Sequence, residues 1–358
     1  MRIPGNRHLQ ISGTRAALQF GALLVVTALL GSALLAAQPH PKTGRLVVYT
    51  VDVEGGQSTL LVSPTGASLL VDTGWAGHDG RDTERIQAAM HEAGVSRIDY
   101  LLITHYHADH VGGVSNLVAR VPVERFYDHG PNREDSNNTR QGYAAYLKAV
   151  DGHPRHILHP GEKIPVPGLN IVVLTADGNH IGTVPGIKPV PNPYCAGERQ
   201  FPADPSENSR SAGILVRYGR FSFLDVGDLT DAKEIALVCP DNPIGRVDLY
   251  LAANHGMTGA NARAFVFAVH PLVAIINNGA HKGDTPEAWQ TIHSSPGLEG
   301  LWQLHSGEDS GDLNSPVEYI ANPAGGGDGA YLKVVASSNG TFALTNSRTG
   351  FTKSYSPK

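Results

Sequence analysis

The sequence predicts an α/β fold whose central strands end in polar loops along one edge of a sheet. Short apolar or β-branched runs alternate with amphipathic and turn-rich stretches along most of the chain. Two of these runs are followed by histidines: 98–104 leads into a segment rich in histidine and aspartate, and 247–252 leads to His255. Without its first 37 residues the chain still has about 320, enough for one large domain with a substantial core.

The first 37 residues have the order of an export signal. Three arginines give a basic start, the run 16–37 contains no charge, and the small pair Ala36-Ala37 precedes Gln38. The uncharged run is also long enough to span a bilayer as a helix. We therefore expect a signal peptide at 1–37, with an uncleaved N-terminal anchor as the alternative. Either reading places the remainder outside the cytoplasm, as a secreted or periplasmic protein or as an anchored one facing outward.

Composition restricts the partners. The 33 acidic and 28 basic residues give a mildly negative chain. Tight non-specific binding of nucleic acid needs many phosphate-neutralising side chains, so nucleic acid is expected as a substrate only. The two cysteines, Cys195 and Cys239, could form a disulfide in an exported chain, but the sequence leaves their pairing open. It also leaves the oligomeric state open.

The elements up to residue 104 follow from hydrophobic period and turn chemistry. Strands are predicted at 46–53 and 58–63, joined through Gly55-Gly56, and at 68–72. A helix is predicted at 83–93, because its apolar residues fall on one face and Gly94 stops it. The strand 98–104 follows.

The second half is predicted from the same signals. We expect a loop at 128–140, a helix at 142–150 and a long Pro-rich segment at 177–212 that forms a wall or lid beside the substrate. Further strands are expected at 214–217, 221–224, 247–252 and 273–277. The tail, 306–358, is predicted as a Gly-rich linker followed by a β-hairpin that turns at Asn339-Gly340.

The segment after strand 98–104 carries the chemistry. His105, His107, Asp109 and His110 place three imidazoles and a carboxylate within six residues. These are ligands that suit zinc. The spacing lets His105 and His107 converge on one ion, while Asp109 and His110 hold a second. Two such ions could share a hydroxide and activate it near neutral pH.

His105-x-His107-x-Asp109-His110 resembles the HxHxDH signature of the metallo-β-lactamase superfamily, and the stretches 70–74, 223–228 and 254–256 resemble its other motifs in order. The resemblance covers about residues 45–290. It implies an αββα four-layer sandwich over 45–305 and a metal-dependent hydrolase with two zinc ions, or manganese or iron instead. Asp109 and Asp228 would be the catalytic carboxylates. The implied metal ligands are His105, His107, Asp109, His110, Asp228 and His255.

The opening stretch 51–58 resembles a motif of the ComEC-like competence branch, which implies a link to DNA uptake and nuclease activity.

One position departs from the superfamily pattern. About twenty residues before Asp228, where a third histidine is usual, the chain has Glu207-Asn208-Ser209-Arg210-Ser211, and the branch also shows Asn-x-x-Ser there. Asn208 could bind a metal weakly, orient a water or contact substrate. His180 could fill the gap from an adjacent loop, or be solvated.

Three further residues have two interpretations each. Asp72 either orients a ligand from behind or forms a turn. His281 and Lys282 either bind an anionic substrate or lie in a solvated loop. His129 is expected to be a surface or loop histidine.

Three function classes remain open. The first is an exported hydrolase of phosphodiesters, with extracellular nucleic acid as one candidate substrate. The second is a hydrolase of a lactam, lactone or thioester, which the same metal pair could attack. The third is an exported metal-binding protein without catalysis, suggested by the absent third histidine. The six implied ligands favour an enzyme, but no motif in the sequence identifies the substrate.

Overall fold

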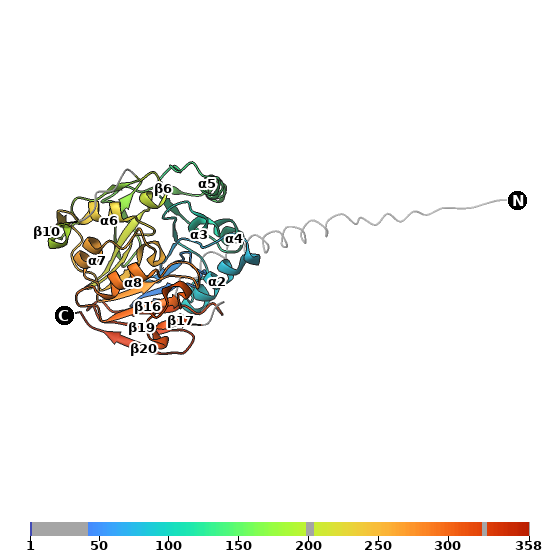
Figure 1. Ribbon diagram of the computed structural model, residues 1–358. Helices are drawn as coiled ribbons and strands as arrows, with labels where there is room; N and C mark the ends of the chain where they lie inside the picture. Colours follow the sequence, from blue (N-terminus) through green and yellow to red (C-terminus); the bar gives the residue numbers. More distant parts are fainter. Residues whose placement is uncertain (2–41, 198–203, 324–327, 358) are drawn as a thin grey trace. The chain divides into compact units, whose positions relative to one another are not determined.

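The computed structural model describes residues 1, 42–197, 204–323 and 328–357 (Figure 1). The predicted export signal and the glycine run 325–327 therefore lie outside the described residues. From Lys42 onward the described residues form one compact unit. Within the described ranges, no helix combines the length and apolarity needed to cross a bilayer.

The first large sheet contains the early strands and the end of the chain. In the described residues its spatial order is β20 (Thr352–Tyr355), β19 (Phe342–Asn346), β18 (Leu332–Ala336), β1 (Leu46–Thr50), β2 (Thr59–Val62), β3 (Ser68–Val71), β4 (Tyr100–Leu102), β5 (Phe126–Asp128) and β6 (Arg155–Ile157). The strands from β3 to β6 run parallel, so their carboxyl ends meet at one edge.

The second large sheet contains the middle of the chain. Its spatial order, again for the described residues, is β17 (Ile320–Asn322), β16 (Gly300–His305), β15 (Val273–Ile276), β14 (Leu249–Leu251), β12 (Phe221–Asp225), β11 (Gly213–Tyr218), β8 (Asn170–Ala176) and β7 (Lys163–Ile164), with β9 (Asn179–His180) beside β8. The neighbours β12, β14, β15 and β16 are parallel. A separate pair is formed by β10 (Val190–Pro191) and β13 (Asp241–Asn242).

The helices cover the outer faces of the two sheets. They are α2 (Arg81–Ala93), α3 (Ala108–Val111), α4 (Val114–Arg120), α5 (Asn137–Val150), α6 (Asp231–Val238), α7 (Arg263–Val269) and α8 (Pro286–His293). The first four belong with the first sheet and the last three with the second, as their labels in Figure 1 indicate.

Alternating side chains explain this layering. Leu69 and Val71 enter a core shared with Phe223 and Ile275 of the second sheet, whereas Leu70, between them, packs with the helices of the first sheet. The central strands, such as β3, β4, β14 and β15, therefore bury both faces, which accounts for the continuous apolar runs in the sequence. The order helix, sheet, sheet, helix is the four-layer sandwich that the resemblance implied.

The structure adds two features to those predicted from the sequence. The tail forms the expected hairpin, in which β18 and β19 pair across Asn339-Gly340, and β20 adds a third strand. Cys195 and Cys239 form a disulfide. Together with β10 and β13 it ties the Pro-rich segment to the end of α6.

Candidate metal centre

Four buried side chains from two sheets converge in one group. Asp109 and His110 lie in α3, directly after β4, and His255 lies in a short turn after β14. The Nε2 atom of His255 is 3.1 Å from Asp109 Oδ2 and 3.2 Å from His110 Nε2. Asp228, which follows β12, places Oδ1 at 3.2 Å from His110 Nε2 and 3.3 Å from His255 Nε2. These four atoms can hold one metal ion.

A second group lies against the first. His105 Nε2 and His107 Nδ1 face each other at 3.0 Å, and His105 Nε2 is 3.9 Å from Asp228 Oδ2. His105, His107 and Asp228 can hold a second ion. Asp228 is thus common to both groups and offers each of them a different oxygen. Among the described residues no third histidine joins His105 and His107.

The donor chemistry fits metal ions at both groups. Asp228 Oδ1 is buried and accepts no hydrogen bond from any described residue, although two imidazole nitrogens lie near it. A buried carboxylate oxygen without a hydrogen bond is costly unless a cation satisfies it. The facing nitrogens His105 Nε2 and His107 Nδ1, which are 3.0 Å apart, have the same need, because two neutral acceptors repel each other.

The charge states favour metal binding too. Burial, helped by the neighbouring His110 and His107, lowers the pKa of His105 well below its ordinary value, so this imidazole is a neutral donor. Burial acts to raise the pKa of Asp109 and of Asp228, but His110 beside them holds the pKa of both carboxyls well below its usual range. Both are therefore carboxylates at neutral pH. Burial acts to lower the pKa of His110, but Asp228, Asp109 and Asp72 beside it raise this pKa well above its ordinary value.

Side chains behind the ligands fix the orientation of their rings. Asp72 Oδ2 accepts from His110 Nδ1 at 2.7 Å, so the Nε2 atom of this ring faces the centre. Thr104 donates to Asp72 at 2.6 Å and lies 3.1 Å from His105 Nδ1. Glu134 Oε2 accepts from His107 Nε2 at 3.1 Å and leaves Nδ1 free for the site. Such partners set the tautomer and raise the basicity of metal-ligating histidines.

The backbone around the centre is unusual in two places. Asn254 and His255 have positive φ values of 48° and 54°, a conformation that costs non-glycine residues roughly 1–3 kcal/mol. It turns the His255 ring inward from the end of β14. Gly56 lies against Asp109, and a Cβ atom at this position would be 2.4 Å from the Asp109 carbonyl oxygen. Only glycine allows the loop between β1 and β2 to approach so closely.

Comparison with known proteins agrees with this geometry. Residues 51–196 match the family described as the metallo-β-lactamase superfamily. The chain contains a metallo-β-lactamase superfamily domain. The matched stretch carries the first four ligands, and the remaining two lie beyond it.

Curated relatives and a solved structure are similar to parts of this chain. "Recombination protein 2" of Haemophilus influenzae is 26% identical over 65% of this chain and 24% of its own length. A hydroxyacylglutathione hydrolase of Serratia proteamaculans is 28% identical over 35% of this chain and 40% of its own length. The chain therefore spans well under half of either relative. The metallo-β-lactamase fold protein YhfI from Bacillus subtilis has 13% identity and a TM-score of 0.44, over 72% of this chain and 95% of its own.

The other candidate residues of this superfamily domain lie outside the two groups. His180 is exposed on β9, and His281 is exposed and pairs with Glu308 at 3.4 Å. Asn208 begins a short helical turn, and its buried Oδ1 has no hydrogen-bond partner among the described residues. Asp72 takes the position behind His110 that the first of its two readings gave it.

Sequence reasoning missed a buried network next to the centre. Glu207 is fully buried and accepts from His129 Nε2 at 2.9 Å and from the backbone N–H groups of Arg133 and Tyr106. Its own N–H donates to Glu134. His129 is thus a loop residue, as expected, but a buried one. No local signal could reveal this, because the partners lie more than 70 positions apart.

A third group of possible ligands has another role. His305 Nε2 lies 2.8 Å from Asp52 Oδ1 and 3.6 Å from Glu54 Oε2. Arg85 pairs with both carboxylates, at 2.9 and 3.3 Å, and so supplies the positive charge that a metal would bring. We interpret this group as an ion-pair network that anchors the loop carrying Gly56.

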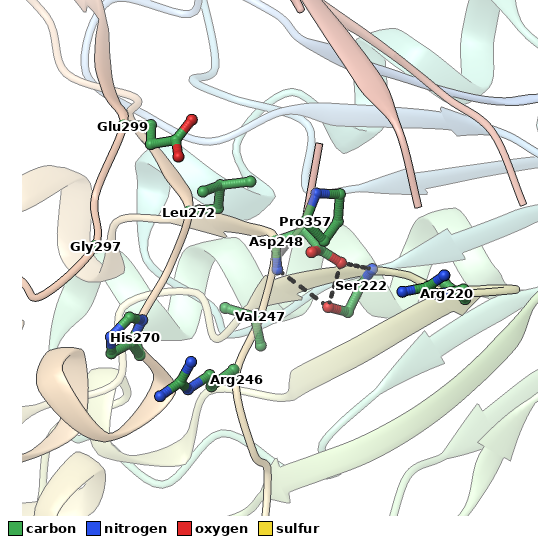
Figure 2. Close-up of a pocket in the computed structure, with 10 residues that line it drawn as sticks. All are labelled: Arg220, Ser222, Arg246, Val247, Asp248, His270, Leu272, Gly297, Glu299 and Pro357. Carbon is green, nitrogen blue, oxygen red and sulfur yellow. Dashed lines mark hydrogen bonds between the residues drawn. The ribbon is translucent and has the colours of Figure 1, made fainter. Parts of the chain in front are cut away.

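One of the surface pockets lies away from the centre (Figure 2). It has a volume of about 270 Å³, and Arg220, Arg246, His270 and Glu299 project around its rim. Ser222 and Asp248, hydrogen-bonded to each other at its base, belong to the beginnings of β12 and β14. The ligands Asp228 and His255 follow the ends of the same strands. The pocket therefore opens at the opposite edge of the sheet and takes no part in the metal centre.

Proposed function

We propose that this protein is a metal-dependent hydrolase of phosphodiesters that binds two zinc ions. One observation carries the proposal: Asp228 presents one oxygen to each of two adjacent ligand groups. A shared carboxylate holds two ions close together, which is the arrangement of two-metal hydrolases. The donors are imidazole and carboxylate, which suit zinc, and manganese or iron are the alternatives.

Bound metal ions and the side chains around them would contribute different parts of the catalysis. When bound, a metal pair supplies a Lewis acid and a hydroxide nucleophile near neutral pH. The chain fixes the ligand positions through Asp72, Thr104 and Glu134. Burial of His105, His110 and His255 keeps bulk water away from the ligand atoms and strengthens every electrostatic interaction there.

Phosphodiesters are the preferred substrate class for two reasons. The stretch 51–58 resembles the ComEC-like competence branch, and a relative over 65% of the chain is named for recombination. A thioester or lactone remains the second candidate, because another relative is a hydroxyacylglutathione hydrolase.

The substrate class can be tested by parallel assays of the metal-loaded protein. The panel is bis(p-nitrophenyl) phosphate, single-stranded DNA, a chromogenic cephalosporin and a simple lactone. We expect turnover of the first two, lost in Asp109→Ala and His255→Ala and retained in His180→Ala, whose side chain is exposed. Turnover of only the cephalosporin or the lactone would favour the second class, and a metal-loaded protein inactive on all four would favour a binding protein.

We further propose that the protein is exported. The basic and apolar order of residues 1–37 supports this, and so does the Cys195–Cys239 disulfide, since disulfides persist in oxidising compartments. A reporter fused after Pro41 should be active outside the cytoplasm. Its retention inside would contradict export, and a processed end near Gln38 would distinguish a secreted or periplasmic form from an anchored one.

A further inference from the structure

Lys282 is held at the metal centre by its backbone and by the stem of its side chain. It lies in a tight turn after β15, where Gly279 N donates to Lys282 O at 2.8 Å. A Cβ atom at Gly55 would lie 2.9 Å from Lys282 Cβ. The loop between β1 and β2 therefore packs directly on this lysine and fixes where its side chain begins.

The ammonium group of Lys282 lies beside the candidate metal ligand Asp109. Lys282 Nζ contacts Asp109 Oδ2 and lies 5.0 Å from the centre of the Trp75 ring. The side chain is 30% exposed, whereas that of Asp109 is 9% exposed. The ammonium therefore lies between a buried metal ligand and solvent, with an indole face on one side.

We propose that Lys282 binds the anionic oxygen of the substrate, which makes the centre selective for substrates that carry negative charge beside the scissile bond. This inference rests on the proposed function and adds that the substrate is anionic. A phosphodiester carries that charge, and a neutral lactone or ester does not.

The proposal follows from what metal binding does to the charges. Asp109 belongs to a ligand group, so a bound ion takes the carboxylate that Lys282 now contacts. Like charges repel, so the ammonium must then turn from the ion toward solvent. The first carbon of the Lys282 side chain packs against Gly55, and the face of the Trp75 ring stabilises a cation nearby. With an ion bound, Lys282 would therefore present a partly exposed positive charge beside the centre, where a substrate oxyanion could pair with it.

The test compares an anionic and a neutral substrate. The variants are Lys282→Met, Lys282→Arg and Trp75→Leu. The matched control is Lys353→Met, which removes a lysine that also lies over aromatic rings, at 5.3 Å from Tyr319 and 5.0 Å from Tyr355, on β20. Metal content is measured for every variant by elemental analysis.

With bis(p-nitrophenyl) phosphate, Lys282→Met should raise KM by about tenfold, the effect of losing one charged hydrogen bond. Lys282→Arg should recover most of this loss, and Trp75→Leu should show a smaller rise. With p-nitrophenyl acetate, KM should not change, and Lys353→Met should match the wild type throughout. Equal changes for both substrates, or loss of metal from Lys282→Met, would overturn the proposal.

A binding measurement separates this proposal from the proposed function. Inorganic phosphate is titrated calorimetrically into the zinc-loaded wild type and into Lys282→Met. We expect about tenfold weaker phosphate binding in the variant. If the wild type hydrolyses neither substrate, the proposed function fails, and the titration still decides on Lys282: equal phosphate affinity in the two proteins would refute its role.

Discussion

Each of three ligand imidazoles uses its second ring nitrogen for a contact behind the centre. His110 donates to Asp72 and His107 donates to Glu134, while His105 Nδ1 lies beside Thr104. These contacts decide which nitrogen faces the metal. The ligand geometry therefore depends on residues that touch no ion.

Glu134→Gln tests this dependence. Glutamine keeps an acceptor for His107 but lacks the negative charge that makes the imidazole more basic. We expect metal affinity of the group containing His107 to fall by about 10-fold or more, with little loss of folding stability. Competition with a chromogenic chelator measures the affinity.

Glu162→Gln is the control for Glu134→Gln. Glu162 also bonds a histidine, His156 at 3.0 Å, but this pair lies on the exposed side of the molecule. Metal affinity should be unchanged in this variant. Equal losses in the two variants would show that the Glu134 contact has no special role.

Asp225 should make stability depend on pH. Burial raises the pKa of its carboxyl to about 6, against an ordinary value of 3.8. The folded state therefore keeps a proton that the unfolded chain releases between these values. This contribution is fully present below pH 3.8 and is lost as pH rises through 6. It amounts to about 3 kcal/mol, from the two-unit difference in pKa.

Asp225→Asn should remove this pH dependence. The difference in unfolding free energy between wild type and variant, measured by urea titration with a chelator present, should shift by about 3 kcal/mol in favour of the variant between pH 4 and pH 7. The exposed Asp151→Asn should show no such shift. A constant difference across this range would contradict the buried protonation.

At the level of elements, the local sequence predicts most of the strands and where they end. The runs around β1, β3, β4 and β12 are buried along most of their length, and candidate metal ligands follow β4 and β12. The ligands His105 to His110 were visible because one short segment carries all four. Glu134 was not singled out and Lys282 kept two interpretations, because their roles depend on contacts with partners 27 and 173 positions away. The helix α5 begins five residues before the predicted start, where Ser136 accepts from Thr139 N and caps it.

The loop between β1 and β2 should control the metal ligands through Gly56. Gly56→Ala places a Cβ against the Asp109 carbonyl oxygen, so α3 or the loop must move. We expect metal affinity at the group containing Asp109 to fall by at least about tenfold. Gly182→Ala is the control, since a Cβ there meets no atom within 4 Å. Wild-type zinc affinity in Gly56→Ala would show that the close approach is not needed.

At the level of the whole molecule, both sheets supply ligands. His105, His107, Asp109 and His110 follow strands of the first sheet, and Asp228 and His255 follow strands of the second. A bound ion therefore joins the two sheets. At a free zinc concentration 100 times Kd, binding should stabilise the fold by about 2.7 kcal/mol.

Chelation should accordingly lower Tm, and added zinc should restore it in a concentration-dependent way. His255→Ala should show a much smaller zinc-dependent rise, because one link between the sheets is gone. Differential scanning fluorimetry measures both. A Tm that does not respond to zinc would contradict metal binding across the sheets.

The disulfide should stabilise the fold without affecting the centre. It closes a loop between cysteines 44 positions apart, so Cys195→Ser with Cys239→Ser should lower the unfolding free energy by about 2–4 kcal/mol. Metal content should stay at the wild-type value, since neither cysteine is near a ligand group. A loss of metal on reduction would indicate that the Pro-rich segment supports the ligands.

The distribution of ligands along the chain also fixes when an ion can be acquired. His255 lies 145 positions after His110, so a chain that has packed only the strands from β1 to β6 offers an incomplete set of donors. Stable capture must wait until the second sheet has packed. The medium in which folding finishes would then decide which ion the protein binds. A chain that crosses a membrane unfolded would carry the metal of its destination.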